Sequence, residues 1–348
     1  MSAARKSGPA KAGVAEVRRG FCGTVGGTPL IRLGRLSEAT GCEILGKAEF
    51  LNPGGSVKDR AGLAIIEDGE RRGLLKPGGT VVEGSAGNTG IGLALVANAK
   101  GYRCIVVIPD TQSPEKMALL RAMGAEVRAV PQAPYPEPAN YNKIAERLAG
   151  EIRGGFWANQ FDNLANREMH YRTTGPEIWR QTGGAVTAFV AAVGTGGTLA
   201  GTSLFLKERS PAIRTVCADP YGSVTYSWIK TKTLDDEGDS ITEGIGQGRV
   251  TKNLEGAPVD DAYRISDQTA IEMLYHLARE EGLLLGSSSA INVCGAVKLA
   301  RERGRGQVIV TILADGGQRY LSRLYNPAWL AEKGLTPKAK GLEFLDRL

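Results

Sequence analysis

The stretch from residue 188 to residue 207 reads AFVAAVGTGGTLAGTSLFLK. Ala188–Val193 is continuously apolar, as expected for a buried strand, and Leu199–Lys207 has the composition of a helix. Gly194–Thr198 is the only connection between the two. A strand that passes directly into a helix through a glycine-rich turn is the repeating unit of parallel α/β folds. The stretch therefore predicts an α/β protein.

The same alternation of strand and helix runs through the chain from residue 43 onward, which indicates parallel βαβ units. Gln307–Leu313 (QVIVTIL) is almost continuously apolar, as expected for a strand with both faces covered. Four prolines within Pro131–Pro138 interrupt the alternation and predict an exposed loop. Further strands are predicted at Glu43–Glu49, Thr80–Glu83, Arg103–Ile108, Glu126–Val130 and Thr215–Asp219, and helices at Asp59–Arg72, Ile91–Lys100, Gln268–Glu281 and Ala290–Arg301.

The composition excludes several classes of protein. The chain has 348 residues, 42% hydrophobic and 23% charged, as in ordinary globular proteins large enough for two cores. Its net charge of +6 is concentrated in residues 1–20, which hold five basic side chains and one acid and which we expect to be a disordered basic tail. The remainder has no basic stripe and no apolar run of about 18 residues, so we expect neither a nucleic-acid partner nor a membrane.

The cysteines and histidines argue against disulfides and metals. The five cysteines are odd in number and widely spaced, which favours a reducing, cytoplasmic compartment over a disulfide framework or a zinc site. With only two histidines, His170 and His276, a histidine-rich metal centre is not expected either.

Gly194–Thr198 (GTGGT) has the character of a phosphate site. Its glycines let backbone N–H groups converge, and the helix that follows favours an anion at its N-terminus. Two threonine hydroxyls add donors. The sequence is neither a P-loop nor a G-x-G-x-x-G fingerprint. A plain glycine-rich turn remains the alternative.

Lys58 lies in the segment Asn52–Arg60 (NPGGSVKDR), at a junction between a loop and a predicted helix. Partial burial and the positive end of a helix dipole both disfavour the charged ammonium and lower the pKa of a lysine. A neutral amine can form a Schiff base with an aldehyde. An exposed lysine at a helix start is the alternative.

Ser85–Gly90 (SAGNTG) follows a predicted strand and opens a helix. By the same physics its N–H groups and hydroxyls suit a carboxylate. An ordinary capping loop would look similar when taken alone.

Together the three loops resemble the cysteine synthase (O-acetylserine sulfhydrylase) group of fold-type II pyridoxal-phosphate enzymes. The resemblance begins at Gly26–Leu30 (GGTPL) and ends at Arg319-Tyr320, so it covers most of the chain. It also includes Gln160-Phe161, Thr173–Trp179 (TTGPEIW) and Gly244–Gly246 (GIG). So many motifs in one order make the resemblance highly specific.

The resemblance implies pyridoxal 5′-phosphate as the cofactor, held covalently by Lys58. It implies that Asn88 hydrogen-bonds the 3′ oxygen of the pyridine ring and that the substrate carboxylate lies on the Ser85–Thr89 loop with Gln160. The residues so implied at the phosphate are Gly194, Thr195, Gly196, Gly197 and Thr198, and those at the substrate are Ser85, Ala86, Gly87, Asn88, Thr89, Gln160 and Gly244.

Three departures from the family pattern leave the substrate and the nucleophile open. Ser85-Ala86 stands where the family has Thr-Ser, and Ser288-Ser289-Ala290 stands where it has Ser-Ser-Gly. In our alignment Gly316 replaces a serine that serves the pyridine nitrogen in the family. We therefore expect a water at Gly316, with Asp315 as the alternative partner of that nitrogen.

The resemblance implies two doubly wound domains with mostly parallel sheets and the cofactor in the cleft between them. The smaller domain is expected at residues 50–160, and the larger at residues 21–49 together with residues 161–348. A homodimer is expected as well, while docking of a serine acetyltransferase tail stays open.

The expected reaction is β-replacement on an activated serine, first of all that of a cysteine synthase, in which O-acetylserine and sulfide give cysteine and acetate. A sibling enzyme that uses thiosulfate, homocysteine, an amine or O-phosphoserine is the alternative, and so is a β-eliminating lyase. A non-catalytic, cofactor-dependent binding protein is disfavoured by the intact Lys58 and phosphate loop.

Overall fold

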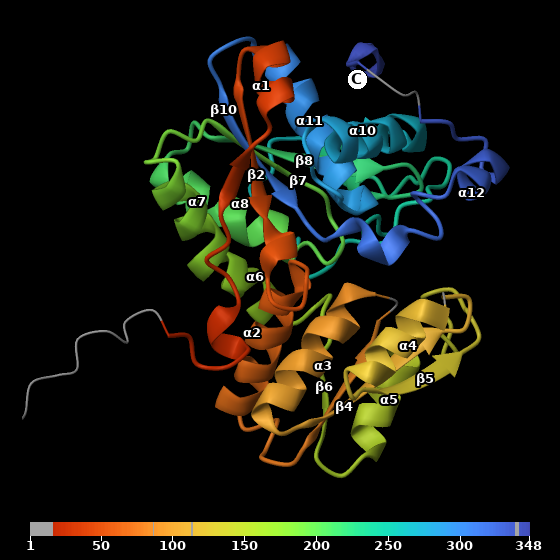
Figure 1. The fold of residues 1–348 in the computed structure, drawn as a ribbon. Coiled ribbons are helices and arrows are strands. Elements are labelled where there is room, and N and C mark those ends of the chain that lie inside the picture. Colours follow the sequence, from red (N-terminus) through yellow and green to blue (C-terminus); the bar gives the residue numbers. More distant parts are fainter. Residues whose placement is uncertain (1–16, 86, 113, 338–340) are drawn as a thin grey trace, which may run out of the picture.

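The fold is seen in a computed structural model that describes residues 17–85, 87–112, 114–337 and 341–348, with residues 114–116 described by their backbone only. Ala86 and most of the predicted tail, residues 1–16, lie outside the described residues. Two β-sheets, each with its own helices, lie one above the other (Figure 1).

The larger sheet has six strands in the order β1-β2-β10-β7-β8-β9. Only β1 runs antiparallel to its neighbour, and every other pair is parallel. The strands are β1 (Leu30–Arg32), β2 (Glu43–Ala48), β7 (Ala188–Ala191), β8 (Arg214–Pro220), β9 (Asp261–Ile265) and β10 (Val308–Leu313).

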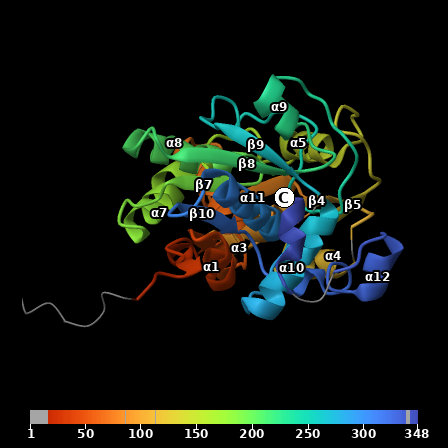
Figure 2. The same ribbon diagram turned by 90° about the horizontal axis from the view of Figure 1, so that it is seen from above.

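Helices cover both faces of this sheet, as Figure 2 shows from above. The alternation of side chains along β7 demonstrates this, because Ala188 and Val190 belong to one hydrophobic cluster and Phe189 and Ala191 to the other. The first cluster includes residues of α1 (Gly34–Thr40), α10 (Asp267–Glu280) and α11 (Ser287–Arg303), and the second residues of α7 (Gly175–Gln181), α8 (Gly197–Arg209) and α9 (Thr225–Thr231).

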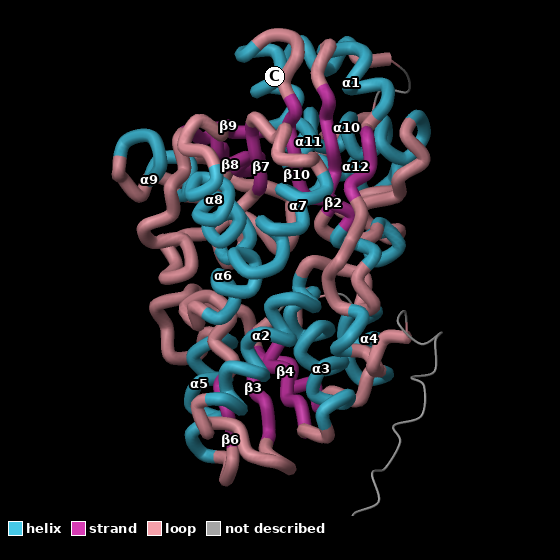
Figure 3. Tube along the Cα trace, turned by 90° about the vertical axis from the view of Figure 1, so that its left-hand side faces the viewer, coloured by secondary structure: helices cyan, strands magenta, loops and turns pink. Residues whose placement is uncertain are grey.

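The smaller sheet has four parallel strands in the order β5-β4-β3-β6. It forms a separate group of strands below the larger sheet in Figure 3. Its strands are β3 (Thr80–Gly84), β4 (Arg103–Pro109), β5 (Glu126–Val130) and β6 (Gly155–Trp157). One face packs on α2 (Lys58–Arg71), α3 (Asn88–Lys100) and α4 (Pro114–Ala122), and the other on α5 (Tyr141–Glu151).

The remaining elements are short. Helix α6 (Ala165–Met169) leads through a π-helical turn, η3 (His170–Thr174), directly into α7. The others are α12 (Pro327–Glu332) and the 3₁₀ segments η1 (Cys22–Thr24), η2 (Glu49–Leu51), η4 (Gly317–Tyr320) and η5 (Glu343–Arg347). No helix in the described part of the chain is both long and apolar enough to cross a membrane.

Both sheets are doubly wound, which confirms the predicted fold class. In the smaller sheet β4 and β5 follow β3 on one side and β6 returns to its other side, and in the larger sheet β8 and β9 follow β7 on one side and β10 returns to its other side, so each sheet has a point where the order of strands reverses. It lies between β7 and β10 in the larger sheet and between β3 and β6 in the smaller one. Loops at the carboxyl ends of such strands form the ligand crevice of open α/β sheets. The boundaries at residues 50 and 160 stay a prediction.

Two glycines bring α2 and α3 into backbone contact. A Cβ atom at Gly62 would lie 2.9 Å from the carbonyl carbon of Gly92, and a Cβ atom at Gly92 would lie 2.8 Å from the carbonyl oxygen of Lys58. Both distances are shorter than any real contact of a Cβ atom. The start of α2, which carries Lys58, is therefore set directly against α3.

We predict that Gly92→Ala lowers the free energy of unfolding by about 1–3 kcal/mol, because the added methyl group must push two backbones apart. Gly150→Ala is the matched control, since Gly150 also lies in a helix but has no heavy atom within 4 Å of the added carbon. Alanine there should be neutral or stabilise by up to about 1 kcal/mol. Chemical denaturation measures both, and equal effects would contradict the contact.

Candidate active site

A cavity of about 790 Å³ lies where the two switch points face each other. Its walls come mainly from the loops that follow β3, β6, β7 and β10, from residues 242–247, and from the starts of α2 and α11. The cavity therefore occupies the crevice that doubly wound sheets use for ligands.

The cavity brings together most of the residues that the sequence singled out. Gly197 and Gly316 do not line it, and Ala86 lies outside the described residues. The predicted residues that do line it are Lys58, Ser85, Gly87, Asn88, Thr89, Gln160, Gly194, Thr195, Gly196, Thr198 and Gly244.

Lys58 is the first residue of α2, and its half-buried side chain enters the cavity. The position of this helix start is fixed from the larger sheet, because the N–H of Val57 donates to the carbonyl of Ala314 at 2.9 Å. Burial lowers the pKa of Lys58 to about 8, although the carboxylate of Asp315 acts in the opposite direction. A substantial fraction of the amine is therefore neutral near physiological pH.

The glycine loop between β7 and α8 forms a cradle that side chains would fill. A Cβ atom at Gly194 would lie 2.3 Å from the carbonyl oxygen of Gly244 and 3.7 Å from Lys58 Nζ. Gly196 has a left-handed backbone with φ +87°, and a Cβ atom there would meet Leu254 at 2.8 Å. The first turn of α8 has N–H groups without partners in the helix, and these are available to an anion.

Side chains behind the cradle hold its two threonines. Asn166 Nδ2 donates to Thr195 Oγ1 at 2.8 Å. Thr198 Oγ1 lies 3.1 Å from Nε2 of His170, whose Nδ1 lies 2.8 Å from Thr174 Oγ1. Burial lowers the pKa of His170 to about 3, so the imidazole is neutral and adds no charge to the site.

The first side chain of the Ser85–Thr89 loop accepts hydrogen bonds from backbone N–H groups of the residues that follow it. Ser85 Oγ accepts hydrogen bonds from the N–H groups of Gly87 at 3.3 Å and of Gly90 at 3.2 Å. Thr89 Oγ1 donates to Gln160 Oε1 at 2.6 Å, which joins the loop after β3 to the loop after β6. The N-terminus of α3 begins at Asn88, so the loop directs a helix terminus at the cavity.

Asn88 is held from the larger sheet at both ends of its carboxamide. Its Nδ2 donates to Asp315 Oδ2 at 2.7 Å, and its Oδ1 accepts from the guanidinium of Arg319. Asp315 Oδ2 also accepts from the hydroxyl of Tyr320 at 2.6 Å, and Arg319 also donates to the carbonyl of Gly54. The segment after β10 thus ties together the loops that precede α2 and α3.

Gly316 is placed differently from our expectation. Its backbone forms a bridge with Leu285, and the space that its Cβ atom would take is occupied by the carboxamide of Gln318, 2.4 Å away. It is not among the residues that line the cavity, and the water expected at Gly316 stays a prediction. Ser288, in the first turn of α11, is a hydroxyl residue that lines the cavity, and the sequence marked it only as part of a departure from the family.

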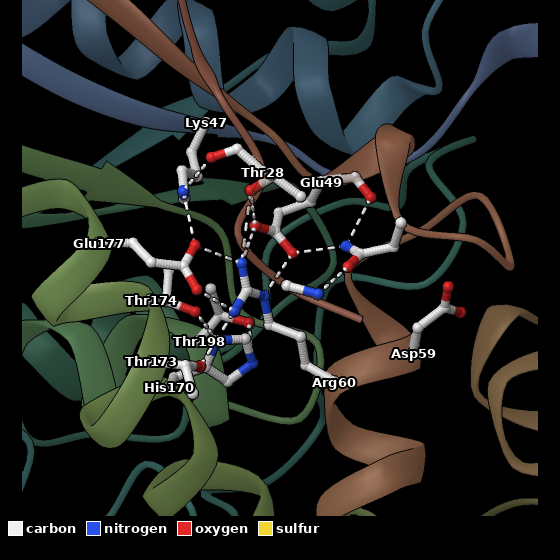
Figure 4. Close-up of polar contacts among 12 residues, drawn as sticks. Thr28, Lys47, Glu49, Asp59, Arg60, His170, Thr173, Thr174, Glu177 and Thr198 are labelled. Atoms are coloured by element: carbon white, nitrogen blue, oxygen red, sulfur yellow. Dashed lines mark hydrogen bonds and ion pairs between the residues drawn. The ribbon is translucent and has the colours of Figure 1, made fainter. Parts of the chain in front are cut away.

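Two residues beyond Lys58, the guanidinium of Arg60 lies fully buried between two carboxylates (Figure 4). It donates to both oxygens of Glu49 at 2.8 Å and to the two oxygens of Glu177 at 2.9 and 2.8 Å. Burial alone would lower the pKa of Arg60, but the two carboxylates outweigh it and raise that pKa.

Lys47 balances the second negative charge of this cluster. Its Nζ lies 2.7 Å from Glu177 Oε2 and donates to Gln181 Oε1 at 2.9 Å. Burial would raise the pKa of Glu177, but Arg60 and Lys47 hold it at about 2. The cluster of Lys47, Glu49, Arg60 and Glu177 is thus electrically neutral, and it joins η2, α2 and α7 behind the cavity.

A doubly wound α/β fold with a lysine of lowered pKa beside an anion cradle defines the class of protein, a fold-type II pyridoxal-phosphate enzyme. Residues 22–315 match the family model described as "Pyridoxal-phosphate dependent enzyme". The chain belongs to this family and, within it, to the cysteine synthase group.

Relatives and solved structures agree with this assignment. The chain is 55% identical to "Cysteine synthase 1" of Neurospora crassa over 324 residues, which cover 92% of this chain and 86% of that protein. The crystal structure of O-ureido-L-serine synthase matches with a TM-score of 0.81 and 36% identity, over 89% of this chain and 98% of that one. The O-acetylserine dependent cystathionine beta-synthase from Helicobacter pylori matches with a TM-score of 0.79 and 37% identity, over 87% and 97%.

We predict that Arg60→Met lowers the free energy of unfolding by about 3–5 kcal/mol, because it leaves the buried carboxylate of Glu49 without a cation and that of Glu177 with Lys47 alone. The matched control is Arg103→Met, whose exposed side chain pairs with Glu126 at 3.4 Å. An exposed pair contributes about 0–1 kcal/mol. Denaturant titration compares the two variants, and a similar loss in both would show that the cluster does not hold this region together.

Proposed function

We propose that this enzyme is a cysteine synthase, which replaces the acetate of O-acetylserine with sulfide to give cysteine and acetate. The observation that carries the proposal is the amine of Lys58, with its lowered pKa, between a phosphate-sized glycine cradle and a helix terminus that suits a carboxylate. The name of the relatives that are 55% identical supports the same reaction.

The residues around the cavity fit pyridoxal 5′-phosphate. The cradle of Gly194–Thr198 offers backbone N–H groups and hydroxyls to the phosphate, and the half-buried amine of Lys58 suits a bond to the aldehyde. Asn88 and Ser288 are the polar side chains that we assign to the ring's 3′ oxygen and nitrogen. When bound, the cofactor supplies an electron sink for charge that develops at the substrate's α-carbon.

Lys58 is the residue that we assign to proton transfer at the α-carbon. A general base works best when its pKa lies near the working pH, and the pKa of this amine is about 8. An unburied lysine has a pKa near 10.4 and would be almost fully protonated. The walls of the cavity therefore prepare the amine for this task.

The Ser85–Thr89 loop is the site that we assign to the carboxylate of the amino acid. The positive end of the α3 dipole and the free N–H groups of its first turn favour an anion. Because Ser85 Oγ already caps Gly87 and Gly90, its role is to shape the loop. Holding the carboxylate there leaves the β-substituent directed into the remaining volume of the cavity.

We predict that the purified enzyme converts O-acetylserine and sulfide into cysteine, and that Lys58→Ala abolishes this reaction, since no other assigned group can carry the cofactor or move the α-proton. Borohydride reduction of the wild type should fix the cofactor on Lys58. The measurement is cysteine formation, followed with sulfide, thiosulfate and homocysteine as competing nucleophiles. A faster reaction with another nucleophile, or pyruvate as the only product, would overturn the proposal.

We predict that Gly196→Asp lowers the affinity for the cofactor by 100-fold or more, about 3 kcal/mol or above, because a carboxylate at the cradle repels the phosphate and the left-handed backbone is strained. Gly248→Asp is the control, since it adds the same charge in open space. Cofactor occupancy after dialysis, read from visible absorption, decides. Equal occupancy in both variants would refute the phosphate assignment.

We also propose that the enzyme works in the cytoplasm as a homodimer, on the strength of the family resemblance. Light scattering at working concentration should give twice the mass of the 348-residue chain. A stable monomer would refute the dimer. Docking of a serine acetyltransferase tail into the cavity is a further proposal, and a peptide from such a tail should then compete with O-acetylserine.

A further inference from the structure

Behind the Ser85–Thr89 loop, three buried side chains form one hydrogen-bonded chain. Thr89 Oγ1 donates to Gln160 Oε1 at 2.6 Å. Gln160 Nε2 donates to Glu83 Oε1 at 2.9 Å and to the carbonyl of Gly84 at 3.2 Å. Thr89 and Gln160 line the cavity, whereas Glu83 lies behind them near the end of β3.

In this arrangement the hydrogen-bonded chain of Thr89, Gln160 and Glu83 presents acceptors to the cavity, and acceptors do not suit an anion. Both amide hydrogens of Gln160 are used by Glu83 and Gly84, and the single hydroxyl hydrogen of Thr89 is used by Gln160. Only lone pairs of Thr89 and Gln160 are left for a ligand in the cavity. From these two side chains a substrate carboxylate would receive no hydrogen bond, so its donors would be limited to the backbone N–H groups at the start of α3.

Rotation of the Gln160 carboxamide by half a turn reverses this polarity. The amide nitrogen then donates to Thr89, which frees the hydroxyl hydrogen of Thr89 and one amide hydrogen for the cavity. The same rotation directs the amide oxygen at Glu83 and withdraws the hydrogen bond from the carbonyl of Gly84. An ionised Glu83 has only lone pairs to offer this oxygen, whereas a protonated Glu83 can donate its O–H to it.

We propose that Glu83 is a positioning residue whose protonated form turns Gln160 and Thr89 into donors for the substrate carboxylate, so that an amino acid binds with Glu83 protonated and takes up a proton there wherever the free enzyme holds Glu83 ionised. The proton comes from solvent, and no covalent bond of the substrate changes in this step. The inference rests on the proposed function, because that function assigns the Ser85–Thr89 loop to the carboxylate.

The surroundings of Glu83 favour its neutral form. Burial raises its pKa to about 8, although hydrogen bonds from the side chain of Gln160 and from the backbone of Gln160 and Asn159 act against burial. Its Oε2 has no hydrogen-bond partner among the described residues, which costs much more for a charged carboxylate than for a neutral acid.

The titratable neighbours of Glu83 are neutral as well. Cys104 of β4 and Tyr141 of α5 interact with Glu83 electrostatically, and the pKa of each is raised, first of all by burial. Within the described part of the chain no lysine or arginine contributes to the pKa of Glu83. The carboxylate is thus not stabilised by a cation, and its charge depends on pH in the range where the enzyme would work.

The test uses the holoenzyme and L-alanine, which has the α-carboxylate and amine of the substrate but no leaving group. The dissociation constant is measured from the change in cofactor absorption between pH 7 and pH 9. Raising the pH through the pKa of about 8 ionises Glu83, so binding by the wild type should weaken about tenfold more than binding by Glu83→Gln. Glutamine cannot ionise, and its amide can donate as the protonated acid does.

Two further variants separate this role from a merely structural one. Glu67→Gln removes a carboxylate that is 53% exposed on the neighbouring α2, and it should follow the wild-type pH profile. Glu83→Met has neither charge nor donor, so it should bind L-alanine more weakly than Glu83→Gln at every pH, without the extra pH dependence.

The outcomes distinguish the inference from the proposed function. If Glu83→Gln keeps the wild-type pH profile, the proton on Glu83 plays no part in binding and the inference is overturned. The same holds if Glu83→Met retains that profile. If neither the wild type nor Glu67→Gln binds L-alanine at any pH, the assignment of the loop to an amino-acid carboxylate falls, and the inference falls with it.

Discussion

The structure depends most on the buried guanidinium of Arg60, which lies between the carboxylates of Glu49 and Glu177. Arg60 follows Lys58 by two residues on α2, and its partners come from segments on the side of the larger sheet. A buried ion pair adds little stability compared with apolar packing, but breaking one is costly, so it is effective at excluding other arrangements. The cluster therefore fixes the position of the start of α2 against the larger sheet. It thereby also fixes the position of Lys58, whose amine we assign to catalysis.

The second constraint is the way in which the two doubly wound sheets face each other. Each has a switch point, between β7 and β10 and between β3 and β6, and the loops that follow these strands converge on one cavity. Close backbone approaches at Gly194, Gly196 and Gly92 leave no room for side chains there. The phosphate cradle, the lysine and the carboxylate loop thus come within reach of one small molecule, although the cradle is more than a hundred residues from the other two in the chain.

Charge in this region is set by groups behind the walls of the cavity. The neutral imidazole of His170 supports Thr198, the carboxamide of Asn88 is held between Asp315 and Arg319, and Glu83 determines which way Gln160 is turned. Of these supporting residues only Arg319 lines the cavity itself and adds a charge there. Such an arrangement lets the polarity of a site depend on protons held one layer away from the substrate.

The sequence by itself determined the α/β class, the principal strands and helices, the glycine cradle and Lys58, because each of these is written in consecutive residues as periodicity, turn chemistry or a short motif. It did not predict β1 and β6, which have three residues each, or β9 and α9, which are also short and depend on their neighbours. It did not predict α5 either, although the apolar residues of that helix gather on one face that packs on the smaller sheet. The tertiary structure alone decided that Ser288 and not Gly316 lines the cavity, that Glu83 lies behind Gln160, and that Arg60 lies between Glu49 and Glu177. The partners of Glu83 and Arg60 include residues 77 and 117 positions away. The first pairing becomes visible only when β6 pairs with β3, and the second only when the two sheets are brought together.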